Sequence, residues 1–147
     1  MNIKFVLLLF VSFSMKLCEN TKTQTAEQDN SYMIEYTAHS RGMYEHITVS
    51  DSIISIQKDR DSKPVTKPYS KKDWEIITSI LKNIDIKAVP KLKAPTEARF
   101  YDGAAIANLK ITNNGTDYET PSFDHGSPPK EIEPLVKEIL SIAENIE

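Results

Sequence analysis

The apolar residues of this chain recur with two different periods, and the order of these periods limits the possible folds. In residues 32–38 apolar and polar side chains alternate, and residues 40–42 end the run. Residues 43–50 and 53–57 form two further runs of the same kind. A period of two, interrupted by turn residues, is typical of strands that are buried on one face. We therefore expect an antiparallel meander of three strands in this part of the chain.

A helical period follows a charged loop. Residues 58–67 are rich in charge and contain Pro64, so we expect a loop that returns as a short edge strand at about residues 65–69. Ser70, with Asp73 three residues later, is a variant of the capping box that begins helices. The apolar side chains that follow at helical spacing are Trp74, Ile77, Leu81 and Ile84. We expect the first helix here, with its apolar face in the core.

The second half of the chain predicts a hairpin. Residues 87–99 contain two prolines, which exclude a regular helix or a central strand. Residues 104–112 are an apolar strand, and the residues at 113–115, Asn-Asn-Gly, are a strong hairpin turn. Residues 116–123 return beside that strand until Pro121 perturbs the pairing.

A final apolar stripe predicts a second helix. We expect it to begin at about Pro128 or Pro129 and to end at Asn145, with Pro134 restarting or kinking it near its first turn. The stripe consists of Ile132, Leu135, Val136, Ile139, Leu140 and Ala143. The order β-β-β-α-β-β-α predicts an α+β fold in which the two helices pack on one face of an antiparallel sheet.

The first 18 residues have the pattern of an export signal. Residues 5–14 are an apolar run that is too short to span a bilayer, and no acidic residue precedes Cys18. Cys18 is the only cysteine of the chain, and residues 15–18, Met-Lys-Leu-Cys, resemble a relaxed bacterial lipobox, whose cysteine is acylated. We expect an exported protein that is anchored in the cell envelope by a lipid on Cys18. Cleavage after Ser14 is the alternative, and it would release a soluble secreted protein.

The remaining chain divides into a tether and a domain. Residues 19–30 are polar and predict a flexible tether, and residues 31–147 predict a single α+β domain. Because the leader carries two lysines and no acid, the other 129 residues hold 16 basic against 21 acidic side chains, a net charge of −5. A mildly acidic chain without a basic stripe argues against nucleic acid as a partner. We expect the lipid to attach the protein to the membrane, and we expect a protein as its other partner.

No known catalytic motif occurs in the sequence, but one polar corner could carry chemistry. All four glycines fall in predicted turns, so no phosphate-binding loop is present. Pairing around a turn at residues 113–115 sets Thr112 against Thr116 and Lys110 against Tyr118. The same register brings residues 99–103 to residues 123–126 at one end of the hairpin. The polar side chains collected there are Arg99, Tyr101, Asp102, Asp124 and His125.

This corner has two interpretations. An Asp beside a His could serve as a base, or two carboxylates and an imidazole could hold a metal. Alternatively, Asp102 and Asp124 hydrogen-bond the backbone of turns, and Asp124 or Ser127 caps the last helix. We favour the structural interpretation and expect no enzymatic activity, no metal and no cofactor. His39 and His46 could approach each other across the first hairpin, but we expect them to be surface residues.

Residues 34–142 resemble a group of small uncharacterised lipoproteins of Bacteroidota-type bacteria. The motifs that carry this resemblance are Asp73-Trp74, Lys93-Ala94-Pro95-Thr96, Asp102-Gly103-Ala104 and Ser122-Phe123-Asp124-His125-Gly126. More distantly, the element order, with Arg41-Gly42-Met43 after the first strand, is similar to that of the emfourin-like inhibitors of thermolysin-type proteases. This second resemblance implies a peptidase as the partner, with residues 99–102 and the Gly42 turn as contact loops.

Three functions of different classes follow from the sequence. The first is a non-catalytic envelope lipoprotein that binds a protein partner. The second is a secreted or periplasmic protease inhibitor. The third is a small metal-binding protein or enzyme that uses Asp102, Asp124 and His125.

Overall fold

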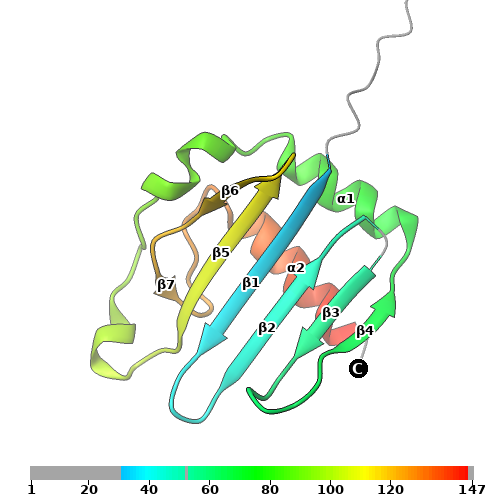
Figure 1. Ribbon diagram of the computed structural model, residues 1–147. Coiled ribbons are helices and arrows are strands. Elements are labelled where there is room, and N and C mark those ends of the chain that lie inside the picture. Colours follow the sequence, from blue (N-terminus) through cyan, green and yellow to red (C-terminus); the bar gives the residue numbers. More distant parts are fainter. Residues whose placement is uncertain (1–30, 52, 146–147) are drawn as a thin grey trace, which may run out of the picture.

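The three alternating runs form the middle of one antiparallel sheet, and the computed structural model describes residues 31–51 and 53–145 of the chain. The strands are β1 (Tyr32–His39), β2 (Tyr44–Val49), β3 (Ile53–Gln57), β4 (Val65–Pro68), β5 (Ile106–Asn113), β6 (Thr116–Glu119) and β7 (Phe123–Asp124). The helices are α1 (Lys71–Leu81) and α2 (Glu133–Asn145), and the 3-10 turns are η1 (Ile86–Lys91) and η2 (Ala98–Tyr101). The strand order is β4-β3-β2-β1-β5-β6, and β7 also pairs with β5 (Figure 1).

The predicted α+β fold is confirmed, with both helices on one face of the sheet (Figure 1). The sheet contains two more strands than the predicted order of elements. One is β4, which confirms the edge strand expected at about residues 65–69, and the other arises because the last strand is divided into β6 and β7. Two predicted segments lie outside the described residues: the export signal at residues 1–18, which contains Cys18, and the tether at residues 19–30. Within the described ranges, no helix is long and apolar enough to cross a membrane.

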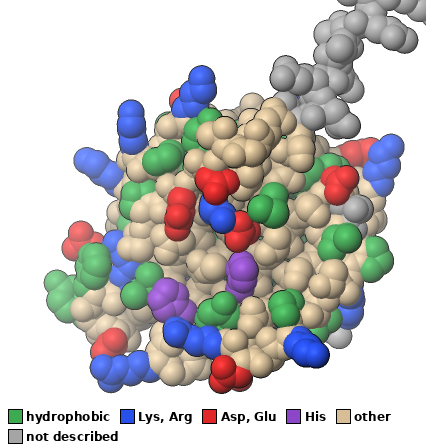
Figure 2. Space-filling view, viewed as in Figure 1, with side chains coloured by type: hydrophobic (Ala, Val, Ile, Leu, Met, Phe, Trp, Pro, Cys, Tyr) green, Lys and Arg blue, Asp and Glu red, His purple; other side chains and the backbone are tan. Residues whose placement is uncertain are grey.

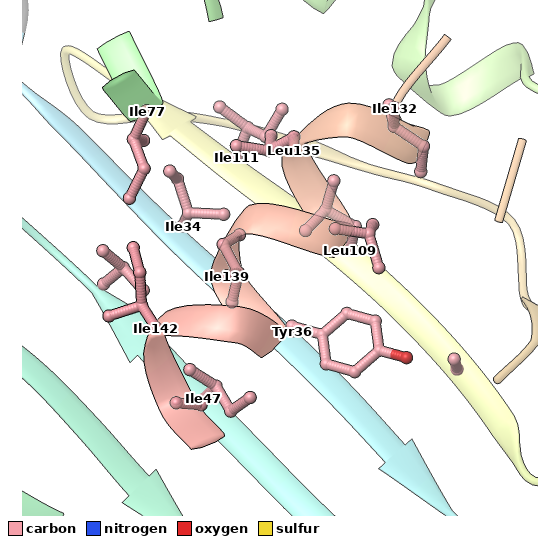
Figure 3. Packing of buried hydrophobic residues seen from close by; sticks show 14 of the residues in the cluster. Ile34, Tyr36, Ile47, Ile77, Leu109, Ile111, Ile132, Leu135, Ile139 and Ile142 are labelled. Carbon is pink, nitrogen blue, oxygen red and sulfur yellow. The ribbon is translucent and has the colours of Figure 1, made fainter. Parts of the chain in front are cut away.

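The core lies between the sheet and the two helices. Ile34, Tyr36 and Ala38 on β1 are fully buried, because they alternate toward the helices as the period of two requires. Ile139 and Leu135 of α2 pack against this face (Figure 3). No helix of the described residues covers the opposite face of the sheet, and charged and histidine side chains gather over its middle (Figure 2).

Helix α1 begins as the capping box predicts and ends earlier than its apolar spacing suggests. Ser70 Oγ accepts a hydrogen bond from Asp73 N at 3.2 Å and donates one to Asp73 Oδ2 at 2.7 Å. The helix ends at Leu81, so Ile84 lies beyond it, although its side chain still packs against the core. Trp74 is half-buried at the edge of the core, where its ring meets that of Tyr69 edge-on.

The hairpin turn is one residue shorter than predicted. Asn114 and Gly115 both have positive φ, 49° and 80°, so they form a two-residue turn of the type I′ kind that matches the strand twist. Asn113 therefore pairs with Thr116, and Lys110 faces Glu119 rather than Tyr118. The predicted register was wrong by one position for this reason.

The return strand is interrupted where Pro121 predicts an interruption. Thr120 N donates to Leu109 O, whereas Phe123 pairs with Ala107, so two residues of the return strand face Asn108 alone. Such a bulge accommodates a proline that cannot donate to the ladder. The bulge divides β6 from β7 and turns Asp124 into the protein.

Helix α2 begins at Glu133, later than the predicted start at Pro128 or Pro129. Pro134 explains the difference, because it lacks an N–H and its ring would collide with the carbonyl of Lys130 in a longer helix. In the observed helix Pro134 lies in the first turn, where a missing N–H has no cost.

Candidate functional site

A buried carboxylate holds the η2 turn in place. Asp124 on β7 is only 2% exposed. Its Oδ2 accepts a hydrogen bond from Ala98 N at 2.7 Å, and its Oδ1 accepts one from Arg99 N at 3.0 Å. Glu97, at the N-cap of η2, makes no side-chain capping bond, so Asp124 provides the cap from a distant strand. The structural role predicted for Asp124 is therefore real, but it caps η2 rather than the last helix.

Arg99 completes this anchor. Its Nη1 lies 3.0 Å from Asp124 Oδ1 and donates a second hydrogen bond to Thr96 O at 2.7 Å. Its Nε donates to Ser122 Oγ at 3.2 Å. The side chains of Arg99 and Asp124 are 8% and 3% exposed, so the pair is buried, and both charged groups are hydrogen-bonded within it.

The anchor keeps Asp124 ionised. Burial by itself raises the pKa of this carboxyl. The hydrogen bonds from the Thr96 side chain, from the backbone and guanidinium of Arg99 and from Ala98 N outweigh that effect and hold the pKa of Asp124 well below its usual range. Asp124 is therefore an anion throughout the neutral range.

Two aromatic side chains follow the anchored Arg99 and project into solvent. Phe100 is 63% exposed and Tyr101 is 82% exposed. The Arg99 guanidinium lies 4.3 Å from the centroid of the Phe100 ring. Asp102 then takes a left-handed conformation, with φ of 56°, and Gly103 N closes the turn on Ala98 O. The Asp102 side chain is exposed and makes no hydrogen bond to a described residue, contrary to its predicted role in turn structure.

His125 points away from both carboxylates. Its Nδ1 lies 2.7 Å from the hydroxyl of the buried Tyr36, and no hydrogen bond or ion pair joins it to Asp102 or Asp124. Burial, followed by the charge of Glu45, raises the pKa of Tyr36. The Tyr36 hydroxyl therefore stays protonated in the neutral range, where it is hydrogen-bonded to Nδ1 of His125. The sequence did not identify Tyr36 as the partner of His125, although the place of Tyr36 on the buried face of β1 was a usable signal.

A hollow of about 460 Å³ lies beside η2, at the end of the sheet where the β1–β2 turn and the β3–β4 loop also lie (Figure 1). Its polar lining comes from three separate segments: His39 and Arg41, Arg60, and Arg99 with Asp102. The two loops implied by the inhibitor resemblance, residues 99–102 and the Gly42 turn, thus border one surface. Of the five residues predicted for the corner, Arg99 and Asp102 line the hollow.

The two strand histidines lie on the open face but have different surroundings. His46 lies opposite Thr37, and its Nε2 is 3.5 Å from Glu35, which also binds Lys110 Nζ at 2.5 Å. His39 instead lines the hollow. In the part of the chain that the structure describes, no group of three or more His, Cys, Asp or Glu side chains is arranged to hold a metal ion.

No protein-family model matches the chain significantly. No curated protein and no solved structure does so either.

Proposed function

We propose that this protein is a non-catalytic, lipid-anchored module of the cell envelope that binds a protein partner through the η2 end of its sheet. The observation that carries the proposal is the exposed pair Phe100 and Tyr101 on a turn that a buried carboxylate holds rigid. Aromatic side chains and arginine are the residue types that contribute most binding energy at protein interfaces.

The anchor lowers the entropic cost of binding. A flexible loop loses conformational freedom when a partner orders it, whereas the η2 backbone is already held by Asp124 and by the bond from Gly103 N to Ala98 O. Phe100 and Tyr101 are thus presented in one conformation of the backbone. This arrangement favours recognition over catalysis, because the buried charges of the site serve to position the turn.

The position of this end also supports the proposal. Ser31, the first described residue, is bonded to Asn114 at the far end of β5, while η2 precedes the near end. An eight-residue strand separates the two ends by roughly 25 Å. The tether predicted at residues 19–30 would join the domain at Ser31, and η2 lies at the other end of the sheet from that junction (Figure 1).

Site-specific photo-crosslinking tests this function. The full-length protein with Tyr101→p-benzoylphenylalanine is irradiated in its native envelope, and the matched control carries the same probe in place of Ile76, which is 36% exposed on α1. We expect a discrete adduct from position 101 alone, and we expect Phe100→Ser to diminish it. Identical adducts from both positions, or no adduct from position 101, would contradict the proposal.

A protease inhibitor is the second candidate, and one observation favours it. The Gly42 turn and residues 99–103 border a common surface, so both could enter the cleft of a peptidase together. The test is to add equimolar protein to secreted metallopeptidases of the same organism. Inhibition that Tyr101→Ser weakens would support this candidate, and full residual activity would exclude it.

A further inference from the structure

All three arginines of the chain line one hollow. Arg41 lies in the β1–β2 turn, Arg60 in the β3–β4 loop and Arg99 in η2, so segments far apart in the sequence bring them together. The chain has fifteen lysines, and none of those described lines this hollow. Arginine differs from lysine in having a planar fork that fits carboxylate and phosphate oxygens with two parallel hydrogen bonds.

Two of these arginines form no ion pair with a described residue. Arg99 is paired with Asp124, but no ion pair joins Arg41 or Arg60 to any described carboxylate. In the same loop as Arg60, Asp59 Oδ1 accepts a hydrogen bond from Asp61 N at 3.0 Å. The guanidinium of Arg60 instead lies 5.5 Å from the centroid of the Tyr44 ring.

The β1–β2 turn holds Arg41 beside the same space. Ser40 N donates to Met43 O at 2.8 Å and closes this turn. His39, at the end of β1, adds a further polar group to the wall. The lining of the hollow thus contains two arginines without an ion pair to a described residue, Arg99 paired with Asp124, and a single acid, Asp102. Asp59 and Asp61, on either side of Arg60, line an adjoining hollow instead.

We propose that this hollow binds a carboxylate side chain of an acidic segment of the protein partner. The proposal rests on the protein-binding function and names the chemistry that its contact surface recognises. A volume of about 460 Å³ exceeds the space of a single ion and suits a side chain with its flanking residues. Asp102 in the wall opposes a doubly charged phosphate more strongly than it opposes a carboxylate.

The aromatic pair extends this site. Phe100 directly follows Arg99, which lines the hollow, and the Arg99 guanidinium lies over its ring. An apolar residue next to the bound carboxylate would contact Phe100 and Tyr101. The preferred segment therefore combines acidic and aromatic residues.

A titration with defined peptides tests this inference. The full-length, isotope-labelled protein in detergent micelles is followed by amide NMR while acetyl-Glu-Phe-Glu-amide is added. The two parallel arms use acetyl-Gln-Phe-Gln-amide and inorganic phosphate. We expect saturable shifts at Gly42 and Gly103 with the acidic peptide, weaker at high salt, and no comparable shifts in the other two arms.

Matched variants locate the site. Arg41→Ala and Arg60→Ala should each weaken binding of the acidic peptide about tenfold, because each removes a charge-assisted, two-bond contact. Lys63→Ala removes the same charge from the same exposed loop outside the hollow, and it should change the affinity less than about twofold. Unchanged melting temperatures for all three variants would show that the fold is intact.

The outcomes separate this inference from the proposed function. Equal binding of the amide peptide, equal shifts with phosphate, or no effect of Arg41→Ala and Arg60→Ala overturns the carboxylate site. A cross-link at position 101 without peptide binding leaves the protein-binding function standing and removes the carboxylate site. Peptide binding at Gly42 and Gly103 without a cross-link at position 101 leaves the carboxylate site standing and contradicts the proposed protein-binding function.

Discussion

Asp124 lies on β7 but caps the η2 turn, and the hydrogen-bond donors around its carboxylate keep it ionised. Its two oxygens accept hydrogen bonds from Ala98 N and Arg99 N, and the guanidinium of Arg99 lies against Oδ1. A carboxylate with this many donors can be neither protonated nor removed without leaving buried donors unsatisfied. The presentation of Phe100 and Tyr101 therefore depends on a residue that lies 23 or more positions away in the sequence.

The first prediction concerns this anchor. Asp124→Ala should lower the melting temperature by several degrees, because it leaves the buried guanidinium of Arg99 and two backbone N–H groups without their acceptor. Thermal unfolding followed by circular dichroism measures the change. Asp102→Asn is the control, since Asp102 is exposed, has no hydrogen bond to a described residue and has a φ of 56° that Asn tolerates. A larger loss from Asp102→Asn than from Asp124→Ala would contradict the assignment.

The second prediction is a pH dependence at the same residue. The pKa of Asp124 is depressed in the folded protein and has its ordinary value of about 3.9 in the unfolded chain. Between these values the unfolded chain binds more protons, so the stability contributed by Asp124 is present above about pH 4 and is lost as the pH falls toward the folded pKa. Urea unfolding at about pH 5 and about pH 3 should show a smaller loss in Asp124→Asn than in the unaltered protein.

At the scale of the element, turns decide how the hairpin and the last helix are placed. The two-residue turn at Asn114 and Gly115 shifts the whole β5–β6 register by one position relative to the three-residue turn that the sequence suggests. Pro134 moves the start of α2 to Glu133. The capping box at Ser70 was predicted correctly, because a cap depends only on residues within one turn.

The third prediction tests the hairpin turn. Gly115→Ala should reduce the free energy of unfolding by about 1 kcal/mol, because φ of 80° is strained for a residue with a Cβ atom. Gly42→Ala is the matched control, since an added Cβ meets no atom within 4 Å there and no positive φ is required. Its effect should stay within about 0.5 kcal/mol in urea unfolding. Equal losses from the two variants would count against the type I′ turn.

At the scale of the whole molecule, the sheet has two different faces and two different ends. The helices bury one face, and charged and histidine side chains gather on the other (Figure 2). There Glu35 contacts both Lys110 and His46. Ser31, the first described residue, lies at one end of the sheet, and η2 and the hollow lined by the three arginines lie at the other. The strands thus separate the proposed binding surface from Ser31, where the predicted tether to the proposed lipid anchor joins the domain.

The fourth prediction tests the anchor. Mass spectrometry of the protein purified from its native envelope should find Cys18 as the mature N-terminus, with the added mass of its lipids. Cys18→Ala should move the protein from the membrane to the soluble fraction, since position 18 then has no thiol to which a lipid can be attached. A free Met15 as the N-terminus would show cleavage after Ser14 and contradict the lipid anchor.

The sequence by itself determined the α+β class, the buried face of each central strand and the beginning of α1. These features depend on periodicity and on contacts within a turn, which neighbouring residues decide. The sequence also predicted that Arg99 lies close to Asp124, because the position of the hairpin turn between them sets which residues pair. It did not reveal that Asp124 caps η2 or that His125 turns to Tyr36 on β1.

Only the tertiary structure decided that Arg41, Arg60 and Arg99 share one hollow. Their convergence requires β1 to lie between β2 and β5, so that the β1–β2 turn, the β3–β4 loop and η2 meet at the same end of the sheet. No local pattern specifies this strand order, because it results from burying the apolar faces of distant segments against the same two helices.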